Sequence, residues 1–122
     1  MTTFTEDPHA GEFILSEANG YLSRESVTIE SGQTLKAGAV LGQVSGSGEY
    51  REYNPGNADG SETAVAVCYA YVDASGGAEE QTIVARLAEV DSNRLVWFDG
   101  ASEAQKTTGK GELAAESNIQ AR

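Results

Sequence analysis

The 122-residue sequence predicts one mainly β domain with a short C-terminal helix and a flexible N-terminal arm. Short apolar or alternating runs separated by glycine- and asparagine-rich turns predict the strands. A capping pattern after Asp99-Gly100 predicts the helix. The first dozen residues show neither a helical nor an alternating period, and a chain of this length has room for a single domain.

Residues 1–12 are the predicted arm, and residues 13–122 are the predicted domain. The arm holds little apolar surface beyond Phe4, so burial cannot offset the entropy lost on ordering it. Fully extended, a dozen residues reach about 40 Å. The run Phe13-Ile14-Leu15 begins the ordered part of the chain and is expected to anchor the arm.

The middle of the chain predicts several short strands. Residues 27–30 alternate apolar with polar side chains, and residues 49–53 form a second short strand. Residues 35–44 include two glycines, which suit a bend or a bulge. The stretch 54–60 carries the strongest loop signal in the sequence.

Residues 63–72 are apolar on both alternating faces, which predicts a strand buried on both sides. Residues 81–90 fit both a helical stripe and a strand, and the β-branched start together with the neighbouring strands favours a strand. Residues 95–98 are expected to form a short strand or a loop anchor.

Ser102 is the predicted N-cap of the helix, and Gln105 stands where a capping box needs its partner. Gly109 and Gly111 predict that the helix frays early, since each costs about 1 kcal/mol relative to alanine.

Composition excludes several classes of function. The formal net charge is −11 at pH 7, which disfavours binding to nucleic acid. No apolar run approaches the roughly 18 residues of a membrane span, and the start of the chain has neither the basic nor the apolar part of a secretion signal. The many alanines among the apolar residues predict a small core, which contacts between copies would supplement.

The sequence predicts no catalytic, cofactor-binding or metal-binding residue, and therefore no enzyme. The single histidine, His9, lies in the arm and cannot be held in catalytic geometry. Cys68, the single cysteine, lies in an apolar strand, where a thiol acts as a packing group. Residues 57–60 resemble part of a calcium loop, but Pro55 and Ala66 occupy ligand positions.

A second interpretation is a small β-rich ligand- or carbohydrate-binding module with an aromatic stacking platform. The candidate platform residues are Tyr50, Tyr53, Tyr69, Tyr71 and Trp97. Ordinary packing in the core or at an interface is the competing interpretation of these aromatics.

Several stretches after residue 12 are informative through their order and spacing. They are Phe13-Ile14-Leu15-Ser16-Glu17, Ser23-Arg24-Glu25, Gly32-Gln33-Thr34-Leu35-Lys36-Ala37-Gly38, Val40-Leu41-Gly42, Asp59-Gly60-Ser61-Glu62-Thr63-Ala64 and Leu95-Val96-Trp97-Phe98-Asp99-Gly100-Ala101. Together they resemble the lambda-type head decoration proteins of tailed bacteriophages. The sequence departs from that pattern near its end, where Gly109, Gly111, Ser117 and Gln120 weaken the expected helix and strand.

The resemblance implies a β-clip (tulip-like) fold and a homotrimer without enzymatic activity or cofactor. It also implies binding to the major capsid protein on the outside of the expanded phage head, at local three-fold sites, where the trimer stabilises the shell against DNA pressure. The protein would be made in the cytoplasm of the host bacterium and reside on the outer surface of the virion, with neither nucleic acid nor membrane as a partner.

The residues expected to contact the capsid are Phe4, Phe13, Ile14 and Leu15, which belong to the arm and its anchor. An extended arm can add as a strand to an exposed sheet edge of the shell protein. Three tethered arms in a trimer would bind at a high effective concentration.

Overall fold

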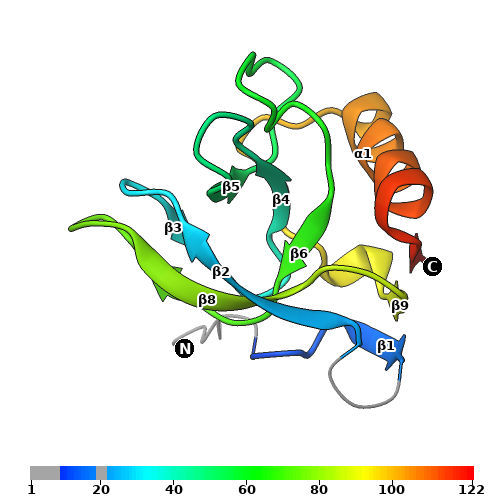
Figure 1. Ribbon diagram of the computed structural model, residues 1–122. Coiled ribbons are helices and arrows are strands. Elements are labelled where there is room, and N and C mark those ends of the chain that lie inside the picture. The colour runs from blue at the N-terminus through cyan, green and yellow to red at the C-terminus, as the bar shows by residue number, and fades with distance from the viewer. Residues whose placement is uncertain (1–8, 19–21) are drawn as a thin grey trace, which may run out of the picture.

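The computed structural model describes residues 9–18 and 22–122. Within these residues the chain is mainly β, as predicted, with one α-helix close to the C-terminus (Figure 1). The strands are β1 (Ile14–Glu17), β2 (Arg24–Ile29), β3 (Thr34–Leu35), β4 (Val40–Gln43), β5 (Tyr50–Glu52), β6 (Ala66–Cys68), β7 (Val72–Asp73), β8 (Glu79–Val84), β9 (Ala88–Val90) and β10 (Ile119–Ala121). A short 3₁₀ turn, η1 (Ser92–Arg94), precedes the helix α1 (Glu103–Ser117).

A closed barrel in the order β2-β5-β4-β6-β8 forms the body of the domain. Its longest pairing is the antiparallel β2–β8 ladder, which runs from Arg24 opposite Val84 to Ile29 opposite Glu79. A second sheet has the order β1-β9-β10, with β10 parallel to β9. Strands β3 and β7 form a separate pair. Figure 1 shows α1 along one side of the barrel, with the C-terminus next to β9.

Two apolar clusters fill the domain. One lies between the β1-β9-β10 sheet, α1 and the barrel, and includes Phe13, Tyr53, Leu113 and Ile119. The other centres on barrel residues such as Ile29. The predicted alanine-rich core is present, since six alanines are buried: Ala37, Ala39, Ala64, Ala66, Ala74 and Ala88.

The strand predicted over residues 63–72 is correct at its centre and wrong at its ends. Only β6, Ala66–Cys68, pairs with β4 and β8, and its three residues are fully buried as predicted. The chain then leaves the barrel, and Val72 pairs with Leu35 of β3 instead. Tyr71, at this departure, is 56% exposed.

The strand interpretation of residues 81–90 is confirmed, but the chain forms two strands there. The break lies at Leu87, whose φ of 54° turns the chain from β8 of the barrel to β9 of the second sheet. Residues 95–98 act mainly as a loop anchor, because Val96 forms only an isolated bridge with Ala39.

The predicted capping box at the start of α1 is confirmed. The Ser102 hydroxyl accepts a hydrogen bond from the Gln105 backbone N–H (3.2 Å), and the Gln105 side chain accepts one from the Ser102 N–H (3.0 Å). The prediction of an early end is wrong, since α1 continues through both glycines to Ser117. Packing explains the difference: Gly109 is buried against Trp97, and tertiary contacts outweigh helix propensity.

In the part of the chain that the structure describes, no helix is long and apolar enough to cross a membrane.

Candidate interaction surface

A turn at residues 9–12 ties the start of the described chain to the domain. The Gly11 N–H donates a hydrogen bond to the Tyr69 carbonyl (2.9 Å), and Gly11 has a φ of 69°. A side chain there would begin 2.9 Å from the Tyr69 ring, so glycine allows both the conformation and the close approach. The last four residues of the predicted arm are therefore held against the domain, and residues 1–8, including Phe4, lie outside the described residues.

An ion pair reinforces this turn. The Glu12 carboxylate lies 2.6 Å from the Arg94 guanidinium and accepts a hydrogen bond from the His9 backbone N–H (3.0 Å). The His9 hydrogen bond and the Arg94 charge both favour the ionised form, so the pKa of Glu12 is lowered. Arg94 also lies 3.5 Å from Asp91 and thereby joins the turn to the region before η1.

The predicted anchor residues occupy three different environments. Phe13 is buried in the core, only 1% exposed, and its carbonyl accepts a hydrogen bond from the Asp91 N–H (2.8 Å). Ile14 is half-buried and pairs with Val90 of β9. Leu15 lies at an irregularity between β1 and β9 and is 55% exposed. In the structure Phe13 therefore holds the chain, while Leu15 presents apolar surface to the outside.

Two further exposed leucines, which the sequence analysis did not single out, belong to two segments that are hydrogen-bonded to each other where the barrel meets the second sheet. Leu22 is 61% exposed and Leu87 is 44% exposed. Two side-chain hydrogen bonds connect these segments. The hydroxyl of the buried Ser23 donates a hydrogen bond to the Leu87 carbonyl (2.8 Å), and the Arg86 side chain donates one to the Leu22 carbonyl (2.8 Å). Neither leucine stands out in the sequence, because an apolar residue at a strand end is ordinary until its exposure is known.

A shallow groove of about 270 Å³ borders Leu87. Its lining residues come from β1, β9 and the end of α1: Ser16, Glu17, Leu87, Ala88, Glu89, Asn118 and Gln120.

Three arginine–glutamate pairs surround these leucines and the groove. Arg24 lies 2.6 Å from Glu17, and Arg86 lies 2.7 Å from Glu25. At the C-terminus, Arg122 lies 2.9 Å from Glu89. This region is therefore locally charge-balanced, although the whole chain carries a net charge of −11.

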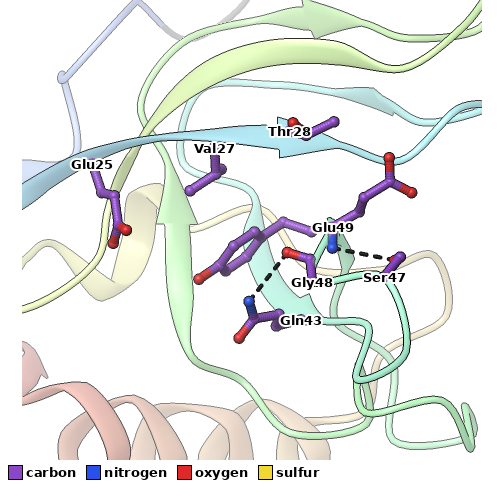
Figure 2. A pocket seen from close by; sticks show the side chains of 8 residues that line it. Glu25, Val27, Thr28, Gln43, Ser47, Gly48 and Glu49 are labelled. Atoms are coloured by element: carbon purple, nitrogen blue, oxygen red, sulfur yellow. Dashed lines mark hydrogen bonds between the residues drawn. The ribbon is translucent and has the colours of Figure 1, made fainter.

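A second, polar groove of about 490 Å³ lies between β2, β4 and β5 (Figure 2). Tyr50 lines this groove together with Val27 and Gln43. Figure 2 shows Gln43 donating a hydrogen bond to the Gly48 carbonyl (3.1 Å). Burial, and then the negative charge of Glu25, raise the pKa of Tyr50. Because Glu25 is already paired with Arg86, its charge is largely neutralised for any ligand in this groove.

The five aromatics proposed as a stacking platform do not share one surface. Tyr53 is buried and packs edge-on against Trp97, with ring centres 6.1 Å apart. The Arg24 guanidinium covers Tyr69 at 4.3 Å from the ring centre. Tyr50 lines the polar groove, and Tyr71 is exposed beyond the end of β6. Packing in or against the core, the first part of the competing interpretation, accounts for Tyr53, Tyr69 and Trp97.

Cys68 is a packing group, as predicted. It is fully buried, and burial raises the pKa of its thiol to about 11, so the nucleophilic thiolate is scarce at neutral pH. Across residues 9–18 and 22–122, no cluster of three or more histidine, cysteine, aspartate or glutamate side chains is arranged to hold a metal ion.

Comparison with known proteins adds one family match. The family model described as bacteriophage lambda head decoration protein D matches residues 3–119. No curated protein matches the chain significantly.

Proposed function

The chain belongs to the bacteriophage lambda head decoration protein D family, and from this membership we propose that homotrimers of it bind the outside of the expanded head at local three-fold sites. There each trimer braces the major capsid protein against the pressure of packaged DNA. The family is one of structural capsid components, so the chain is a head decoration protein of the virion. The family match over residues 3–119 carries this proposal.

The anchored turn supports a role for residues 1–8 in gripping the shell. Gly11, Glu12 and Phe13 hold the chain directly after these residues against the domain. Eight residues reach roughly 26–29 Å when extended, which is enough to cross a neighbouring subunit's sheet edge. In this proposal the segment adds as a strand to that edge, Phe4 fills an apolar site beside it, and Leu15 contacts the shell at its base.

Trimer formation supports the same role through avidity. One short arm binds weakly, because ordering it costs conformational entropy. Once one arm of a trimer is bound, the other two dock at a high effective concentration. Three weak contacts thereby give stable decoration.

The acidic surface fits a protein that accumulates in the host cytoplasm before it coats finished heads. A net charge of −11 keeps the chain soluble and repels phosphate backbones. Nucleic acid is accordingly not among the proposed partners, which are the major capsid protein and further copies of this chain.

Sedimentation with expanded, empty heads tests the role of the arm. A variant that begins at His9 keeps the anchoring turn, so its melting temperature should match that of the full chain. Its affinity for heads should fall at least tenfold, since the arm contacts are lost. Phe4→Ser should weaken binding in the same direction, and Thr5→Ser is the matched control. Unchanged affinity of the shortened variant would refute the arm mechanism.

A further inference from the structure

We infer that Leu22, Leu87 and the groove beside Leu87 form the surface through which one copy of this chain contacts the next. The inference rests on the proposed homotrimer and assigns it a surface. Three observations carry it: the backbone conformation of Leu87, the shared exposure of the two leucines, and the local charge balance.

Leu87 has a backbone conformation that leucine rarely adopts. Of the residues that the structure describes, only Leu87 (φ 54°) and Asn118 (φ 50°) combine a side chain with positive φ. Asn118 is the C-cap of α1, where asparagine is a usual choice. Glycine or asparagine would suit position 87 better, because leucine's Cβ crowds the neighbouring carbonyl in this region.

Contacts within the protomer compensate only part of the backbone strain at Leu87. The side chain is 44% exposed, so core packing offsets only part of the strain. The backbone is held by three hydrogen bonds, since the Leu87 N–H donates to the Ser117 carbonyl and the Leu87 carbonyl accepts from Ser23 and Ala18. Strained residues persist where function uses them, and here the fixed backbone presents a leucine outward.

Leu22 is the second exposed leucine of this region. It is 61% exposed, and Arg86, the residue before Leu87, donates a hydrogen bond to its carbonyl. Exposed large aliphatic side chains within one region of the surface are typical of a contact with another protein.

The charges beside the leucines favour a second copy as that protein. Two chains of net charge −11 repel each other over most of their surfaces. Here Glu17, Glu25 and Glu89 are each paired with an arginine, so the local repulsion between two copies is reduced at this surface. In a three-fold ring the contact joins two different patches, so a leucine of one copy can enter the groove of the next.

Sedimentation velocity over a range of protein concentrations tests this surface. The full chain should be trimeric, while Leu87→Asn and Leu22→Asn should each raise the concentration at half-assembly at least tenfold. Asparagine tolerates positive φ, so the melting temperature of dilute Leu87→Asn should equal or exceed that of the wild type. Tyr71→Ser removes an equally exposed side chain beyond the end of β6 and should leave assembly unchanged.

The other outcomes separate the two proposals. A wild-type chain that stays monomeric would overturn the proposed trimer and this surface with it. A wild-type trimer with equally trimeric leucine variants would overturn the surface alone. Leucine variants that remain trimeric but no longer sediment with heads would assign the surface to the shell protein instead. Unfolding of Leu87→Asn would overturn the premise that Leu87 acts outside the protomer.

Discussion

At the scale of single residues, the two glycines inside α1 have opposite surroundings. A β carbon at Gly109 would lie 2.5 Å from the Trp97 ring, whereas nothing lies within 4 Å of one at Gly111. Both positions are in the helix interior, where alanine is favoured over glycine by about 1 kcal/mol. The same substitution should therefore have opposite effects at the two positions.

Gly109→Ala should destabilise the protein by about 1–3 kcal/mol, because forcing a methyl group against Trp97 exceeds the gain in propensity. Gly111→Ala should stabilise it by up to about 1 kcal/mol. Urea unfolding at one fixed protein concentration measures both. A stabilising Gly109→Ala would mean that the helix does not pack on Trp97 as the structure has it.

Ionisation of Asp59 should make the free energy of unfolding depend on pH in the acidic range. The Ser61 hydroxyl and N–H both donate hydrogen bonds to this carboxylate and lower its pKa. The pKa of Asp59 is thus lower in the folded protein than in the unfolded protein, where it is about 4. Ionised Asp59 therefore stabilises the fold at pH values above about 4, and this stabilisation is lost as the pH falls through the folded pKa. Asp59→Asn should therefore be less stable than wild type at about pH 7, and the two should converge as the pH falls through the folded pKa of Asp59.

Glu52 should affect stability in the direction opposite to Asp59 and therefore serves as a control. Burial raises the pKa of Glu52, the charge of Arg51 offsets part of this effect and the charge of Asp99 adds to it, so ionised Glu52 opposes folding at neutral pH. Glu52→Gln should thus stabilise the protein at about pH 7, and the difference should vanish as the wild-type carboxyl is protonated. Urea midpoints across this pH range measure both variants. Parallel curves for Asp59→Asn and wild type would rule out the role given to Asp59.

Local sequence signals predicted some residue roles and missed others. The capping box at Ser102 could be predicted because its partners lie three residues apart. That α1 continues through Gly109 could not be predicted, because it depends on packing against Trp97, which lies outside the helix. The sequence analysis included Leu87 in a predicted strand and missed its positive φ. This backbone conformation arises where the chain passes from one sheet to the other, and no local sequence pattern indicates it.

At the scale of elements, the turn at residues 9–12 is held to the domain by a backbone hydrogen bond and an ion pair. Arg94→Gln removes the surface ion pair with Glu12, so the free energy of unfolding of the whole domain should hardly change. Local opening should increase: amide hydrogens near Gly11 should exchange several-fold faster. Lys106→Gln, which breaks a surface pair with Glu103, is the matched control and should leave these amides unaffected. Equal exchange in both variants would exclude the ion pair as a clamp.

Most strands were predictable because apolar runs end at turn residues, which the loop at 54–60 illustrates. The length of β6 was not, because residues 63–72 stay apolar after the chain leaves the barrel. Attachment of residues 9–12 also escaped prediction, since it uses a backbone hydrogen bond to Tyr69 and a distant arginine.

At the scale of the whole molecule, net charge should govern assembly. Raising the salt concentration from about 50 mM to about 500 mM screens the repulsion between chains of net charge −11 and should strengthen the proposed trimer. Arg86→Gln leaves Glu25 unpaired beside the leucines, so this variant should assemble more weakly at low salt and recover at high salt. Arg51→Gln, which unpairs Glu30 and Asp59 elsewhere, should follow the wild type. Sedimentation velocity measures all three, and a trimer that weakens with salt would contradict this electrostatic picture.

The mainly β class and the family were accessible from the sequence, because turn spacing and motif order extend over most of the chain. The closed barrel was not, since its order β2-β5-β4-β6-β8 joins strands far apart in the chain. The charge-balanced region was also hidden, because arginines 24, 86 and 122 meet their glutamates only in the fold.

Electron cryomicroscopy of expanded, empty heads assembled from the cognate major capsid protein, incubated with this chain, tests the decoration role most directly. Three-lobed density on the outer surface at every local three-fold position, with an extended segment running from each lobe onto the shell, is the expected result. Bare three-fold positions, or density at other lattice positions, would contradict it.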